Sequence, residues 1–157
     1  MSYKTLKPKI DQFLNCHAIA VLGVSKDANQ PANANYRKLK EAGYAVFPVN
    51  PNCSRVEGDA CYPHVGDIPE KVDAALVFTH PDVTASVVEE CDKAGISNIW
   101  IHKGMGGSTS KIATLYIKSR PGINFIDGAC PLMFLKNGDG FHRGFRNVLR
   151  WTGGLPD

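Results

Sequence analysis

The loop that follows the first apolar run has the residue types of a phosphate site. It consists of Gly23, Val24, Ser25 and Lys26 and leads towards a helical segment. Such a loop can hold phosphate through its backbone N–H groups and through the positive end of the helix dipole. The loop therefore predicts an anionic small-molecule ligand. A turn with a purely structural role is the alternative.

A dinucleotide of the NAD type fits this loop poorly. The dinucleotide fingerprint G-x-G-x-x-G needs three glycines, but Gly23 is the only glycine before Ala28. The second apolar run ends in Val49-Asn50, without the acidic residue that accepts a hydrogen bond from a ribose 2′-hydroxyl. The sequence therefore disfavours NAD.

Two further turns could border a nucleotide. In the turn over residues 48–51, two prolines hold the backbone extended, and Asn50 offers a donor and an acceptor that would suit an adenine edge. Lys103 and Gly104 follow the fourth apolar run, where Lys103 would bring a second cation near the phosphate loop. The alternatives are a strand-terminating turn at Asn50 and a solvated surface lysine at position 103.

His80 and Cys130 are the residues that an enzyme could use. His80 is expected at the tip of a loop, where a single histidine is weak evidence of catalysis. A reactive Cys130 would need an electropositive, partly exposed setting, and a buried structural thiol is the simpler interpretation. We therefore expect no catalytic residue, and an enzyme that uses Cys130 or His80 stays an alternative.

Apolar runs of strand length alternate with amphipathic segments of helix length, which is the rhythm of βαβ units. Strands are expected over residues 18–24, 45–49, 73–78, 98–101 and 123–126. Helices are expected before the first strand, over residues 33–42 and 83–94, and after Ser108 or Thr109, where Ile112, Leu115 and Tyr116 would share one side. The fold class expected is α/β, a doubly wound parallel sheet of about five strands.

Ligands of such sheets bind beyond the carboxyl ends of the strands, where the strand order reverses. If the order is 3-2-1-4-5, the loops after the first and fourth strands face each other. Residues 50–69 contain Pro51, Pro63, Pro69, Gly58 and Gly66 and have no clear period, which predicts a long connection with one short helix.

The composition limits the classes of protein to which the chain can belong. The chain has 157 residues, 43% of them hydrophobic, which suits one packed domain. A formal charge of +3 is too small to indicate nucleic-acid binding, and no apolar run approaches the roughly 20 residues that span a bilayer. Five cysteines without a C-x-x-C pair indicate neither a metal site nor a disulfide framework. These features predict a cytoplasmic protein.

The last residues differ in character from the rest. Residues 1–134 are expected to form the domain. The extension over residues 135–157 combines basic residues with Phe141, Phe145 and Trp151. Because such aromatic side chains favour burial, the extension is expected to pack on the domain or on a partner subunit, and in the second case to build a homo-oligomer.

Several motifs follow one another in an order that is typical of one family. IAVLGVSKD is followed by LKEAGYAVFPVNPN, CYPHVGDIPEKVDAALVFTHPD, IWIHKG and CPLMF. In this order the chain resembles, from about Ala18 to Phe134, the small bacterial and archaeal coenzyme A (CoA)-binding proteins. These are single Rossmann-like domains similar to the N-terminal domain of the succinyl-CoA synthetase α subunit.

The resemblance implies a Rossmann-like fold and a CoA pocket. The residues that it places there are Gly23, Val24, Ser25 and Lys26 at the phosphate, Val49, Asn50 and Pro51 at the adenine, and Phe78, Thr79 and Pro81 in the walls. In the related synthetase, the phosphorylated histidine lies in a second domain. The function expected is therefore binding of CoA or acyl-CoA without synthetase chemistry. An enzyme that uses CoA or an NAD-type nucleotide, and a regulatory module that senses CoA, are the alternatives.

Overall fold

A five-stranded parallel sheet forms the centre of the fold. The computed structural model describes residues 3–103 and 108–136. The sheet consists of β1 (Ala18–Leu22), β2 (Ala45–Val49), β5 (Ala74–Val77), β6 (Asn98–Ile101) and β7 (Asn124–Asp127). All residues of β1, β5 and β6 are buried, as expected of parallel strands that are covered on both faces. The predicted α/β, Rossmann-like fold class is confirmed.

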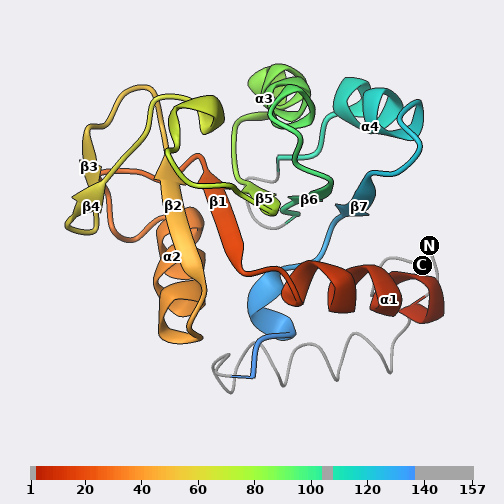
Figure 1. The fold of residues 1–157 in the computed structure, drawn as a ribbon, viewed down its shortest axis with the longest axis horizontal. Coiled ribbons are helices and arrows are strands. Elements are labelled where there is room, and N and C mark those ends of the chain that lie inside the picture. The colour runs from red at the N-terminus through yellow and green to blue at the C-terminus, as the bar shows by residue number, and fades with distance from the viewer. Residues whose placement is uncertain (1–2, 104–107, 137–157) are drawn as a thin grey trace.

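Two pairs of helices cover the sheet. Helices α1 (Tyr3–Leu14) and α2 (Pro31–Glu41) lie on one face, and α3 (Pro81–Lys93) and α4 (Lys111–Lys118) lie on the other (Figure 1). The first pair buries Phe13 and Tyr36 in a cluster with Trp100 of β6. The second pair buries Val88 and Ile117 against the opposite side of the strands. The sheet is therefore doubly wound, as predicted.

The strand order differs from the order 3-2-1-4-5 considered from the sequence. The sheet runs β2-β1-β5-β6-β7, which is 2-1-3-4-5 when only its own strands are counted. The third strand, β5, pairs with β1, because the chain returns from β2 past β1 instead of extending the sheet beyond β2. The order therefore reverses between β1 and β5, and the loops after these two strands are neighbours.

Helix α4 also departs from the prediction. Its N-cap is Ser110, whose hydroxyl accepts a hydrogen bond from the Ala113 N–H, and not Ser108 or Thr109. The buried residues are Ala113 and Ile117, whereas Ile112 is 70% exposed and Leu115 is 69% exposed. Only a narrow face of the helix is covered, because the short helix packs beside α3. Of the three residues expected to share one side, only Tyr116 packs against the core.

The connection over residues 50–69 contains more structure than expected. It includes the predicted short helix, η1 (Val65–Asp67), and a two-stranded hairpin of β3 (Arg55–Val56) and β4 (Asp59–Ala60) that was not predicted. After β7, a second short helix, η2 (Pro131–Met133), is followed by Leu135, which is buried in the core. Residues 137–157 lie outside the described residues. No helix in the described part of the chain has the length and apolarity needed to cross a membrane.

Candidate functional site

A cavity of about 490 Å³ opens at the carboxyl ends of β1, β2 and β5. We call it the larger cavity. The strand ends contribute Leu22 and Gly23, Val49 to Asn52, and Phe78 to His80. This is the edge of the sheet at which ligands of doubly wound folds bind, beside the reversal of strand order between β1 and β5. The fold therefore places the larger cavity where its class predicts a ligand.

Helix α3 forms the opposite wall of the larger cavity. Its contribution is Val83, Ser86, Val87 and Glu90. Val83 is 47% exposed, although Val83, Val87 and Cys91 are spaced four residues apart, as the apolar residues of one helix face are. The stripe that faces the sheet is instead Thr84, Val88 and Cys91, which are fully buried. The sequence did not reveal this wall, because the apolar residues that line the cavity and those that face the sheet repeat along α3 with similar spacing.

Glu90 also fixes the rim of the larger cavity. Its Oε1 accepts a hydrogen bond of 2.7 Å from the Val65 N–H, and its Oε2 lies 3.4 Å from the Nδ1 atom of His64. His64 lines the cavity as well. This carboxylate therefore holds the segment that contains η1 against α3, and with it one side of the opening.

Gly23 allows the loops after β1 and β5 to touch. Its φ angle is +94°, a left-handed conformation that side chains disfavour. A Cβ atom at this position would lie 2.8 Å from the carbonyl carbon of Phe78 and 3.0 Å from the nitrogen of Thr79. The Gly23 N–H donates to the Val49 carbonyl at 3.0 Å, so the same residue also meets the end of β2. The requirement for glycine is therefore structural.

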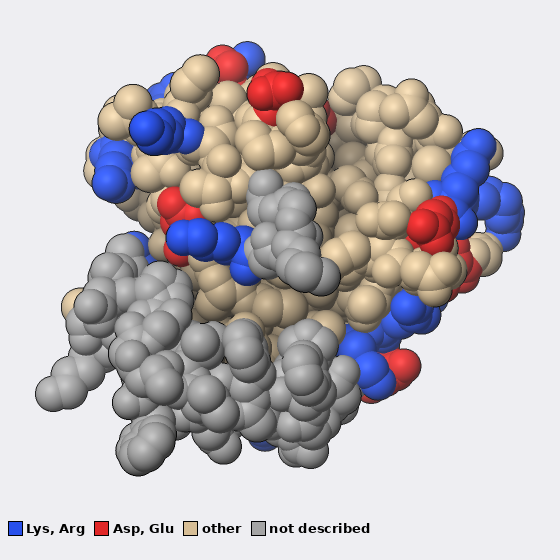
Figure 2. Space-filling model, turned by 180° about the vertical axis from the view of Figure 1, so that it is seen from behind, with Lys and Arg blue, Asp and Glu red and all other residues tan. Residues whose placement is uncertain are grey.

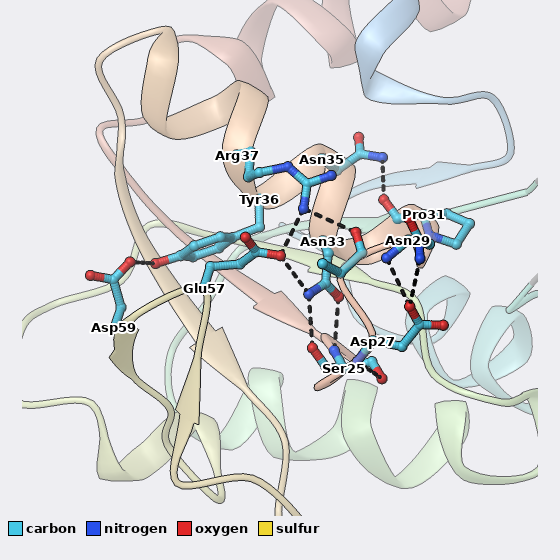
Figure 3. A network of polar contacts seen from close by, with 11 residues as sticks. Ser25, Asp27, Asn29, Pro31, Asn33, Asn35, Tyr36, Arg37, Glu57 and Asp59 are labelled. Atoms are coloured by element: carbon cyan, nitrogen blue, oxygen red, sulfur yellow. Dashed lines mark hydrogen bonds and ion pairs between the residues drawn. The ribbon is translucent and has the colours of Figure 1, made fainter.

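Asn33 of α2 anchors the loop that follows Gly23 (Figure 3). Its Oδ1 accepts a hydrogen bond of 2.9 Å from the Ser25 N–H, and its Nδ2 donates to the Ser25 carbonyl at 2.8 Å. Nδ2 also donates to Oε1 of Glu57 at 2.9 Å. The side chain is 1% exposed. One buried amide therefore joins α2, the loop after β1 and the hairpin.

Charged groups around this amide complete the network. Arg37 pairs with Glu57 at 2.7 Å, and Tyr36 donates to Asp59 at 2.5 Å. Burial and the hydrogen bond to Asp59 raise the pKa of Tyr36. Hydrogen bonds from Lys40 and Tyr36 lower the pKa of Asp59. These contacts fix the β3–β4 hairpin on α2 beside the loop.

The polar groups of Asn50 and Ser25 are used within the protein. The Asn50 amide donates to the Val24 carbonyl at 2.6 Å, and its Oδ1 accepts from the Asn52 N–H at 2.8 Å. The Ser25 hydroxyl accepts from the Asp27 N–H at 3.1 Å. Hydrogen bonds from the Asn29 N–H and the Gln30 amide hold the pKa of Asp27 below its usual value. Asn50 and Ser25 therefore shape the loops at the edge of the larger cavity.

A smaller cavity of about 130 Å³ lies on the other side of Gly23 and Phe78. Its remaining lining residues are Gln30, Pro31 and Ala32 at the start of α2, His102 after β6, and Ser108 before α4. The imidazole of His102 stacks on the ring of Phe78, with 4.5 Å between the ring centroids. The loop after β6 thus contacts the loop after β5, and it lines the smaller cavity together with Gly23 of the loop after β1.

Comparison with known proteins assigns the chain to a family. The family described as CoA binding domain matches residues 17–136, which are most of the chain. The chain belongs to the CoA binding domain family. The resemblance noted from the sequence motifs is thereby confirmed.

Relatives of this CoA binding domain include parts of larger enzymes. An ADP-forming acetate–CoA ligase II from Archaeoglobus fulgidus is 30% identical over 114 residues, which cover 68% of this chain and 17% of the ligase. A hypothetical protein from Pyrococcus horikoshii OT3 is 29% identical with a TM-score of 0.72, over 80% of this chain and 85% of its own. The dinucleotide forming acetyl-coenzyme A synthetase 1 of Ca. Korarchaeum cryptofilum, in complex with phosphate and ADP, is 34% identical with a TM-score of 0.56, over 60% and 21%. The chain thus spans less than a quarter of the ligase and the synthetase.

About half of the residues selected from the sequence as ligand contacts line the larger cavity of this CoA binding domain. Those that line the larger cavity are Gly23, Val49, Asn50, Pro51, Phe78 and Thr79. Those that line neither cavity are Val24, Ser25, Lys26, Pro81 and Lys103. Of these five, Val24 is buried and both lysines are exposed. Gly104 lies outside the described residues.

The two residues considered for catalysis in this CoA binding domain lie in different environments. His80 lines the larger cavity, caps α3 and lies 3.2 Å from Asp82. Cys130 is 8% exposed and packs in the core, with its Sγ 4.0 Å from Nδ2 of Asn35. Cys130 lines neither cavity. No pair of nucleophile and base therefore emerges from these two residues.

Lysines and arginines of the CoA binding domain lie apart from one another on the face shown in Figure 2. They form separate groups, most of them near its margin and one nearer its middle, and acidic side chains lie among them. Within the described ranges, no group of three or more His, Cys, Asp or Glu could hold a metal ion.

Proposed function

We propose that this chain binds coenzyme A or an acyl-CoA and holds the adenosine moiety in the larger cavity. The observation that supports this most directly is the position of that cavity in a member of the CoA binding domain family. It lies at the reversal of strand order, beside the loop after β1. In doubly wound folds, this is the place of the nucleotide.

The dimensions and lining of the larger cavity suit a nucleoside. Small-molecule sites commonly measure about 300 to 1,000 Å³ and combine apolar walls with a few polar groups. Here Val83, Val87 and Phe78 supply apolar walls, and Thr79 and Ser86 supply hydroxyl groups. In the proposal, the turn of Val49, Asn50 and Pro51 borders the adenine, and Phe78 and Thr79 form a side wall of the cavity. Pro81, which does not line the cavity, follows this wall at the start of α3.

The phosphates are proposed to lie along the loop of Gly23, Val24, Ser25 and Lys26. Asn33 holds this loop in one conformation, so the ligand meets a preformed edge. Lys26 is exposed beside it, and Lys103, which is also exposed, follows β6 and precedes Gly104 in the sequence. Exposed lysines can neutralise phosphate without being buried, which suits the charged end of a ligand that extends out of the cavity.

Binding without catalysis is part of the proposal. Cys130 packs in the core away from both cavities, and His80 is the only one of the two candidates at the larger cavity. We also propose that residues 1–134 form the binding domain and that the extension from Leu135 packs on it or on a partner subunit. The buried side chain of Leu135 supports the start of that packing. The described residues include all five cysteines, none of which forms a disulfide, and this supports a cytoplasmic protein.

Ligand-dependent thermal stability tests the proposed function. Free CoA at one hundred times its dissociation constant should stabilise the fold by about 2.7 kcal/mol. NAD at the same concentration should have little effect, because β2 ends in Asn50 and provides no acidic partner for the ribose 2′-hydroxyl. Differential scanning fluorimetry measures both shifts. An equal or larger shift with NAD would contradict the proposal.

A further inference from the structure

Two cysteines lie at the base of the β3–β4 hairpin, one on each side. Cys53 precedes β3, and Cys61 follows β4. The Cys61 N–H donates to the Ser54 carbonyl at 3.0 Å, next to the pair of Arg55 and Ala60 in the hairpin. Cys61 is buried in the core, and Cys53 is half-buried and packs against the same cluster of side chains. The hairpin therefore brings the two thiols to one place.

A single carbonyl joins both cysteines to the wall of the larger cavity. The Asn50 carbonyl accepts a hydrogen bond of 3.3 Å from the Cys53 N–H, which closes a β-turn. The same oxygen accepts from the thiol of Cys61, whose Sγ lies 3.8 Å away. Pro51 and Asn52 are the central residues of this turn and line the larger cavity with Asn50. A change at either sulfur therefore acts on the wall of this cavity.

The two thiols differ in their surroundings. Burial and the neighbouring Cys53 raise the pKa of the Cys61 thiol, so Cys61 stays protonated at neutral pH and is a poor nucleophile. Cys53 is half-buried, and a small oxidant can reach it first. An accessible thiol next to a buried one is the arrangement of an attacking and a resolving cysteine. In a reducing compartment, a disulfide between such a pair is typically transient and serves catalysis or redox sensing.

We propose that Cys53 and Cys61 form a redox-active dithiol, which a low-molecular-weight disulfide oxidises to a disulfide bond across the base of the hairpin. The bond then weakens ligand binding in the larger cavity. This effect on the ligand rests on the proposed function, whereas the formation of the bond is independent of it.

The oxidation consists of two thiol–disulfide exchanges. The Cys53 thiolate attacks one sulfur of the small disulfide, whose S–S bond breaks and releases a small thiolate. Cys61 loses its proton to solvent, and its thiolate attacks the Cys53 sulfur and releases the second small thiolate. The two protein thiols are thereby oxidised, the small disulfide is reduced, and the two small thiolates take up two protons.

The new bond acts on the turn that lines the larger cavity. Cys61 loses its S–H, so the Asn50 carbonyl loses that donor. The two sulfur atoms must approach to about 2.05 Å, which draws Cys53, the last residue of the turn, toward Cys61. Pro51 and Asn52 shift with it. The oxidised protein should therefore bind CoA at least about threefold more weakly than the reduced protein, as expected for the loss of one hydrogen bond.

Peptide mapping after treatment with oxidised glutathione tests the dithiol. The folded protein is incubated with this probe at neutral pH, its remaining thiols are alkylated, and its peptides are analysed by mass spectrometry. We expect two peptides joined between Cys53 and Cys61. Cys61→Ala should trap glutathione on Cys53, and Cys53→Ser should leave Cys61 reduced. Cys16→Ser is the matched control, because Cys16 is also half-buried but lies before β1, at the opposite end of the sheet, and the bond should still form.

Calorimetry with CoA on the reduced and oxidised forms tests the effect on the ligand. CoA should bind more weakly to the oxidised form of the unchanged protein, and equally well to Cys53→Ser before and after the treatment. Glutathione that stays on Cys53 while Cys61 remains free, or no reaction at either cysteine, would overturn the dithiol. Equal CoA affinity of both forms would overturn the effect on the cavity. If the reduced protein does not bind CoA, the proposed function fails, while the peptide map still decides the dithiol.

Discussion

Replacing Gly23 by alanine should destabilise the fold by about 3 kcal/mol or more. The left-handed φ of +94° is strained for alanine, and the added Cβ would lie within 3.0 Å of three backbone atoms of Phe78 and Thr79. These atoms directly follow β5, and the Phe78 N–H donates to the Leu22 carbonyl of β1, so they cannot move without disturbing the sheet. Urea denaturation followed by circular dichroism measures the free energy of unfolding.

Gly43→Ala is the matched control for this experiment. Gly43 has nearly the same φ, +93°, but no atom lies within 4 Å of the position of its added Cβ. Alanine should therefore cost only about 1 kcal/mol there, from backbone strain alone. The difference between the two variants measures the close approach of the loops after β1 and β5. Equal losses in stability would show that this approach has no energetic consequence.

Asn33→Ala should produce the second large effect, a loss of about 2 to 3 kcal/mol in the free energy of unfolding. The substitution removes the hydrogen bonds to the Ser25 N–H, the Ser25 carbonyl and Glu57 (Figure 3). The polar groups of Ser25 and Glu57 remain after the substitution, but they lose their hydrogen-bond partner, and an unsatisfied polar group lowers the stability. Thermal and urea unfolding should agree on the loss.

Asn29→Ala removes an amide from the same region without touching this junction. Asn29 is exposed, and its side-chain amide contacts only Asp27 among the described residues, at 3.1 Å. The expected change is below about 0.5 kcal/mol, as for most surface positions. A loss in Asn33→Ala as small as that in Asn29→Ala would mean that the Asn33 amide does not hold the loop.

Local sequence signals were sufficient for the strands and insufficient for their order. The runs at residues 45–49 and 98–101 agree with β2 and β6 to the residue, because both runs are almost continuously apolar. Whether the third strand returns beside β1 or beyond β2 depends on contacts between distant segments. The β3–β4 hairpin escaped prediction for a different reason, since two-residue strands are too short to show a period.

The site was predictable where it consists of strand ends and unpredictable where it consists of helix faces and tertiary contacts. Gly23, Asn50 and Thr79 lie just after the ends of strands, so sequence motifs identified them. Val83 lines the cavity, but its apolar character and its spacing with Val87 and Cys91 would suit burial in the core equally well. Asn33 contacts residues 8 and 24 positions away, and no local pattern marks such a junction.

Occupation of the larger cavity is tested most directly by CoA calorimetry on Val83→Trp. Val83 is partly exposed on α3, so the larger ring can be accommodated without disturbing the core, and it should fill the mouth of the cavity. The matched control is Ile112→Trp, which enlarges an exposed apolar residue of α4 that lines neither cavity. CoA should bind to the unchanged protein and to Ile112→Trp with the same affinity, and at least about tenfold more weakly to Val83→Trp. Equal CoA affinity in all three folded proteins would contradict binding of the nucleotide in this cavity.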